Sequence, residues 1–172
     1  MTMLIADIIV ILGCGYIGMS FASRMNDRIS QLEEVEKIFS LLAFNIEYMA
    51  IPINEAIVKV QTSASGVIRN ILEQTLEFLA IYNDIPFSDA WRRAVKMSER
   101  DLFLTKDEIK ILHDFSLDVG KGDCEHTVNS VKLTIAKIKH AKETAVAEKN
   151  KNSKLYKGTG FLLGIFIVLI LL

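Results

Sequence analysis

The stretch MLIADIIVILGCGYIGMSFA, residues 3–22, is a nearly uncharged apolar run at the start of the chain. At about 1.5 Å of rise per residue, a helix of this length matches the roughly 30 Å hydrocarbon core of a bilayer. A second apolar run, LYKGTGFLLGIFIVLILL, occupies residues 155–172, and Lys157 near its start can extend toward lipid headgroups. The two ends of the sequence therefore predict two transmembrane helices.

The charged residues lie almost entirely between these runs. The chain has 20 Lys+Arg and 21 Asp+Glu, and all of them except Asp7 fall between Arg24 and Lys157. Because a bilayer tolerates charge poorly, we expect a transmembrane helix at 1–23, a water-exposed domain at 24–154 and a second transmembrane helix at 155–172.

Basic residues beside the two runs predict the orientation. A secretory signal peptide would need basic residues before the apolar run, but Met1-Thr2-Met3 carries none, and Arg24 and Arg28 follow the run. Four lysines without an intervening acid lie before or at the start of the second run, at positions 149, 151, 154 and 157. Since Lys and Arg near membrane helices tend to remain cytoplasmic, we expect the middle domain in the cytoplasm and both termini outside.

Net charge and cysteine content argue against a nucleic-acid partner and against an intramolecular disulfide. The formal net charge of −1 at pH 7 argues against a nucleic-acid partner, since phosphate-binding surfaces normally show a basic excess. The lysine cluster is better interpreted as a contact with the lipid bilayer. Cys14 and Cys124 fall in different predicted domains, so no intramolecular disulfide is expected, as in a reducing compartment.

A glycine motif in the first run favours a competing hypothesis. Gly13-x-Gly15-x-x-Gly18 follows the apolar residues 8–12, and Glu33–Glu36 lie roughly where a ribose contact would be needed. This spacing is typical of dinucleotide-binding folds and would indicate a nucleotide-dependent oxidoreductase. That fold also requires parallel strands, however, and the rest of the chain shows helical spacing. Glycines are moreover common in membrane helices, where they let another helix approach closely.

Between the apolar ends, hydrophobic residues recur with a period near 3.6 and predict an all-α bundle of about six helices. Pro52 separates the first two helices, and Thr105 to Glu108 has the spacing of a capping box. The predicted helices cover 29–49, 53–60, 67–82, a segment beginning at Ser88 or Asp89, one opening after Thr105 and one following Asp123. About 125 residues suffice for a core without disulfides or metal.

The same periodicity predicts which side chains face inward. We expect Tyr82 on the buried stripe of the third helix. In the fourth helix we expect Trp91, Ala94 and Val95 inward and Arg92, Arg93 and Lys96 toward solvent. A tryptophan beside two arginines is also a candidate partner-facing anchor, although helical spacing favours the core.

The sequence shows no group of residues with the spacing expected for catalysis or cofactor binding. His113, His126 and His140 lack the spacing of a helical metal site, and no nucleophile has an activating motif. We therefore expect no enzyme activity, no metal and no cofactor. Asp7 is an intramembrane carboxylate, but near the end of its helix it can simply reach water.

Small residues in the apolar ends are candidates for close helix packing. Gly18 and Ala22 have this role in the first run, and Gly160 and Gly164 form a G-x-x-x-G in the second. Their partner would be the other membrane helix or a neighbouring subunit, so a homo-oligomer is one interpretation.

Several short stretches, in order along nearly the full length, resemble the stage III sporulation protein AB family of endospore-forming bacteria. They are Phe21-Ala22, Arg24, Arg28, Gln31-Leu32, Asn45 to Tyr48, Ile51 to Ala56, Ala90-Trp91, Leu104 to Glu108, Val119-Gly120 with Asp123, and Leu162 to Gly164. Phe115-Ser116 and His126-Thr127-Val128 depart from the pattern we expect of that family.

The resemblance implies a protein similar to the F-domain inner-membrane platform proteins of type II secretion and type IV pilus machines. It implies a role in the channel between mother cell and forespore, in the outer forespore membrane. The implied partners are a cytoplasmic ATPase of the same sporulation operon and other membrane proteins of the channel. Glu47, Glu55, Trp91, Arg92 and Arg93 are our candidates for the partner surface.

Overall fold

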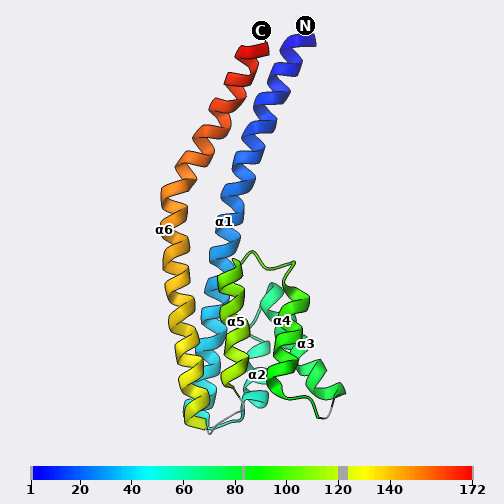
Figure 1. Cartoon of the computed structure of the whole chain (residues 1–172), viewed down its shortest axis with the longest axis vertical. Helices are drawn as coiled ribbons and strands as arrows, with labels where there is room; N and C mark the ends of the chain where they lie inside the picture. Colours follow the sequence, from blue (N-terminus) through cyan, green and yellow to red (C-terminus); the bar gives the residue numbers. More distant parts are fainter. Residues whose placement is uncertain (1, 83, 120–123, 172) are drawn as a thin grey trace. The chain divides into compact units, whose positions relative to one another are not determined.

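The computed structural model describes the backbone of residues 2–82, 84–119 and 124–171, and the side chains at 20, 23–82, 84–117, 119 and 125–151. Within these ranges the chain forms six helices and no strand (Figure 1). They are α1 (Thr2–Met49), α2 (Ile53–Gln61), α3 (Gly66–Ile81), α4 (Phe87–Ser98), α5 (Lys106–Asp118) and α6 (Cys124–Leu171). The all-α fold class with about six helices is confirmed.

The chain divides into two compact units. Unit 1 comprises Met1–Ile29 and Glu143–Leu172, and unit 2 comprises Ser30–Lys142. Both 48-residue helices, α1 and α6, take part in each unit. Among the residues described, no helix carries a stretch long and apolar enough to cross a membrane.

The residues proposed to pack within the membrane cannot be placed at side-chain level. Gly18, Ala22, Gly160 and Gly164 lie outside the residues whose side chains are described, as does Asp7. In unit 1, the described side chains include an ion pair between Arg28 of α1 and Glu148 of α6, at 2.7 Å.

Unit 2 is built around the inward stripe of α1. Residues at three- and four-residue intervals lie on one face of a helix, and the members of this stripe are almost fully buried. They are Leu32, Val35, Ile38, Phe39, Leu42 and Ile46. Around them α3 packs against α2 and α4, and α4 packs against α5.

An aromatic cluster lies at the centre of this core. Trp91 is 2% exposed, and its ring centroid lies 5.2 Å from that of Phe115, 6.0 Å from that of Phe39 and 6.0 Å from that of Phe87. The Phe39 and Phe115 centroids are 4.7 Å apart. Edge-to-face arrangements such as those of Phe39 and Phe115 with Trp91 stabilise a core beyond simple area burial.

Two polar side chains of α1 form hydrogen bonds with loops that connect other helices, one between α4 and α5 and one between α2 and α3. The Gln31 amide donates to the carbonyl of Asp101 (3.2 Å) and accepts from the N–H of Phe103 (2.7 Å). Glu34 accepts hydrogen bonds from the backbone N–H and hydroxyl of Ser65, the residue before α3. These contacts satisfy backbone groups that the loops would otherwise expose to water.

Local signals explain the helix ends. Pro52 and Pro86 immediately precede α2 and α4, where a missing N–H costs nothing. The predicted capping box is confirmed, since the Thr105 hydroxyl accepts from the Glu108 N–H and the Glu108 carboxylate accepts from the Thr105 N–H. Such caps stabilise a helix start by about 1 kcal/mol.

Candidate interaction surfaces

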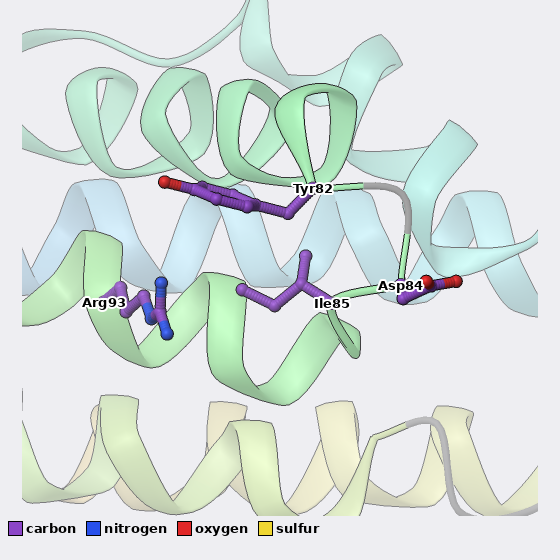
Figure 2. Close-up of a pocket in the computed structure, with 4 residues that line it drawn as sticks. All are labelled: Tyr82, Asp84, Ile85 and Arg93. Atoms are coloured by element: carbon purple, nitrogen blue, oxygen red, sulfur yellow. The ribbon is translucent and has the colours of Figure 1, made fainter.

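A pocket of about 430 Å³ lies at the corner between α3 and α4 (Figure 2). It is lined by Tyr82, Asp84, Ile85 and Arg93. We call these four residues the α3–α4 corner. The corner exists because α3 ends at Ile81, Tyr82 takes an extended conformation (φ −108°, ψ 92°), and Pro86 immediately precedes α4.

The exposure of Tyr82 contradicts one sequence prediction. Its helical spacing placed it on the buried stripe of α3, but the side chain is 51% exposed. The periodic argument fails here because Tyr82 follows the last helical residue, and its extended backbone turns the side chain off the helical face.

Two charged side chains stand at opposite ends of the corner. The Arg93 guanidinium carbon lies 5.9 Å from the centroid of the Tyr82 ring, within the range of a cation–π interaction. Figure 2 shows Ile85 between Arg93 and Asp84. Among the described residues, neither charged group has a hydrogen bond or an ion pair, so both can engage a partner.

The Arg92 side chain is on the solvent-facing side of α4. It is exposed and lies 4.0 Å from Asp89, one turn earlier on the same helix. Exposed pairs of this kind contribute little to stability. As predicted, Arg92, Arg93 and Lys96 face solvent while Ala94 and Val95 are buried.

The turn between α1 and α2 forms a second exposed surface. The rings of Phe44 and Tyr48 are one helical turn apart, with centroids separated by 5.3 Å, and they are 54% and 74% exposed. Glu47 lies beside them and forms a 2.7 Å ion pair with Lys132 of α6. Glu55 is exposed in the first turn of α2, where a carboxylate favours the helix dipole.

The candidate partner residues come from different elements of the fold. Glu47 and Glu55 belong to the α1–α2 turn, whereas Arg92 and Arg93 are on α4. Trp91 belongs to neither surface, because it is buried in the aromatic cluster. The interpretation of Trp91 as a core residue is correct, and its role as an exposed anchor is excluded in this structure.

Sequence reasoning did not single out Phe44 and Tyr48 as surface residues, nor Asp84 and Ile85 as pocket residues. Spacing alone could have indicated the first pair, since both positions fall outside the inward stripe of α1. The corner has no comparable signal, because its lining combines a helix end, a turn and the next helix.

Other titratable groups form local pairs. Hydrogen bonds from Arg69 (2.8 Å), and less strongly from Gln61 (3.3 Å), lower the pKa of the Glu73 carboxyl below its ordinary value. His113 Nε2 lies 3.1 Å from Glu99. Among the residues described, no three His, Cys, Asp or Glu side chains are grouped as a metal site would require.

The glycine motif does not have the backbone of a dinucleotide site. Gly13, Gly15 and Gly18 lie inside α1, with helix on both sides of them. A phosphate-binding loop needs a strand, a turn and then a helix N-terminus, and this sequence of elements is not present at the motif.

Comparison with known proteins agrees with the fold. The family model described as stage III sporulation protein AB matches residues 3–172. Stage III sporulation protein AB of Bacillus subtilis (strain 168) is 22% identical over 172 residues, which is 100% of each chain.

A solved structure of stage III sporulation protein AB (SpoIIIAB) superimposes with a TM-score of 0.66 at 18% identity, covering 73% of this chain and 98% of that one. At this identity the likeness concerns the fold. With the family model matching nearly every residue, the chain belongs to the stage III sporulation protein AB family, a family of sporulation proteins.

Proposed function

We propose that this chain is a non-enzymatic membrane platform of the channel between mother cell and forespore, and that it docks a cytoplasmic secretion-type ATPase. The observation that carries the proposal is the exposed aromatic pair Phe44–Tyr48 at the α1–α2 turn, on a helical domain whose sequence ends are apolar. Family membership supports the role in sporulation. The platform role and the ATPase partner are proposed here in addition to that role in sporulation.

The apolar ends support attachment to a membrane. Helices α1 and α6 have 48 residues each. Unit 2 contains α1 only from Ser30 and α6 only up to Lys142. The remainder of each helix exceeds the roughly 20 residues that cross a bilayer and includes one apolar run of the sequence.

The α1–α2 turn is our choice for the ATPase surface. Phe44, Tyr48 and Met49 are all more than half exposed, and exposed aromatic residues are enriched at the centres of interfaces. Glu47, which pairs with Lys132, lies on the same end of α1, and Glu55 is exposed in the first turn of α2. A basic surface with an apolar centre on the ATPase would match this turn in charge and in hydrophobicity.

A capture experiment tests the docking. The full-length chain in detergent should retain the ATPase of its operon, and Phe44→Ala with Tyr48→Ala should weaken retention by roughly tenfold or more, as expected of central aromatic residues. Leu133→Ala is the matched control, because this side chain is also about half exposed (52%) but lies on α6. Equal retention by both variants would show that the turn is not the docking surface.

A deletion experiment tests the wider role. Removing the gene should arrest development after engulfment, because the channel would lack its platform. Normal spore yield from a clean deletion would eliminate the proposed function.

A further inference from the structure

We propose that the α3–α4 corner is a self-association surface, on which two copies of this chain pair about a twofold axis. In this arrangement Arg93 of each copy faces Asp84 of the other, and the two Ile85 side chains meet near the axis. The inference uses unit 2 alone and does not depend on the docking of an ATPase.

The order of the side chains across the corner is the first argument. A twofold interface uses the same patch on both copies, so the patch must be complementary to itself. Figure 2 shows a cation at one end, Ile85 in the middle and a carboxylate at the other end. Rotation by 180° about an axis through Ile85 brings each charge opposite its counterpart.

The unused bonding capacity of both charges is the second argument. The Arg93 guanidinium carbon lies 5.9 Å from the Tyr82 ring centroid, and a cation–π interaction uses the charge of the guanidinium without using its N–H donors, which can still bind a carboxylate. Asp84 is exposed. Within the described part of the chain, neither of these two groups is engaged by another charge.

The apolar surroundings are the third argument. Ile81 (61%), Tyr82 (51%) and Met97 (62%) are large exposed side chains, at the end of α3 and one turn beyond Arg93 on α4. Burial of such residues supplies affinity, whereas the two ion pairs fix the register.

The same features favour a second copy over an acidic protein. An acidic partner would require a pocket of one sign, but Asp84 would repel it at one end of the corner. Only a partner whose charges run in the opposite order satisfies both ends, and a second copy of this chain has that order by symmetry.

Cysteine cross-linking tests the axis. We would use the full-length chain in detergent with Cys14 and Cys124 changed to Ser. Ile85→Cys should form a disulfide-linked dimer under mild copper-catalysed oxidation, because this position faces itself across the axis. Val58→Cys on α2, an exposed apolar position (54%), should not, although it is more accessible than the half-buried Ile85. A folded Ile85→Cys protein that gives no more dimer than Val58→Cys overturns the proposal.

Charge reversal in the Ile85→Cys background tests the pairing. Arg93→Asp alone places two pairs of carboxylates in contact, and Asp84→Arg alone places two pairs of cations in contact. Each should lower the dimer yield at least roughly fivefold, given the few-fold effect of a single exposed pair. Circular dichroism confirms that each variant remains folded.

Mixing the two variants, one of them affinity-tagged, provides the decisive result. The mixed dimer contains two opposite-charge pairs, so tagged and untagged chains should cross-link to each other at close to the yield of the parent protein. Cross-linking no greater in the mixture than in either variant alone would overturn the proposal. A Tyr82–Arg93 contact important only for folding would not produce rescue on mixing.

Discussion

The indole Nε1–H of Trp91 donates a 2.7 Å hydrogen bond to the backbone carbonyl of Leu112. The bond joins α4 to α5 inside the core, where Leu112 is 1% exposed. A buried tryptophan needs such an acceptor, because an unpaired N–H in an apolar environment is destabilising. At this buried position, the tryptophan therefore has a backbone acceptor for its indole N–H.

Two substitutions of Trp91 should destabilise unit 2 to different extents. Trp91→Phe removes the hydrogen bond and part of the ring, and should lower the free energy of unfolding by about 1–3 kcal/mol. Trp91→Ala also leaves a cavity and should cost about 3–5 kcal/mol. Urea unfolding followed by circular dichroism measures both. Arg92→Ala, which removes an exposed neighbour, should stay within about 0.5 kcal/mol of the parent.

Gln31→Ala should loosen the connection between α4 and α5. The substitution removes both amide hydrogen bonds, to the Asp101 carbonyl and from the Phe103 N–H, which together contribute about 1–3 kcal/mol. Hydrogen exchange at the Phe103 amide should accelerate, while the same measurement on Ser30→Ala, an exposed neighbour, should match the parent. Unchanged protection of Phe103 in Gln31→Ala would contradict this role.

Glu73 should make stability depend on pH in the acid range. Hydrogen bonding to Arg69 lowers the carboxyl pKa in the folded state, so the unfolded chain takes up a proton first as the pH falls. The contribution is therefore complete above the ordinary Glu pKa and is lost as the pH falls through the lowered value.

Comparison of Glu73→Gln with the parent at pH 6 and pH 3 measures this dependence. The difference in urea midpoint should be larger at pH 6 and should shrink at pH 3. It should be small throughout, because the pair is exposed to solvent. Glu77→Gln, an exposed position on the same helix, serves as the control. A difference that grows on acidification would reverse the assigned sign.

Cys124 reports the predicted orientation. If the middle domain faces the cytoplasm, a membrane-impermeant maleimide should label a Cys14→Ser variant only after the cells are opened. A Cys124→Ser variant carrying a cysteine added before Met1 should be labelled in intact non-sporulating cells that produce the chain, since we expect the termini on the outer face of their plasma membrane. Labelling of Cys124 in intact cells would reverse the topology.

Much of the fold could be predicted from local patterns. The inward Ala94 and Val95, the solvent-facing Arg92 and Arg93, the break at Pro52 and the capping box at Thr105 all follow from interactions within a few residues along the chain. These predictions hold because helical periodicity and capping are properties of neighbouring residues.

The candidate site was less predictable. Arg93 was a candidate from its sequence context, but the other three residues of the α3–α4 corner were not, and Tyr82 was expected to be buried. The pocket at this corner depends on how α3 and α4 pack together, and a single sequence contains no direct record of that packing.

The sequence by itself determined that the chain is all-helical, that its ends are apolar and that its charges lie between them, because each property depends on residue type and local spacing. Tertiary structure decided that Trp91 belongs to the core and that Asp84, Ile85 and Arg93 share one pocket. The physical reason is that burial and proximity arise from contacts between segments distant along the chain. Residues 39, 91 and 115 meet only when α1, α4 and α5 pack together.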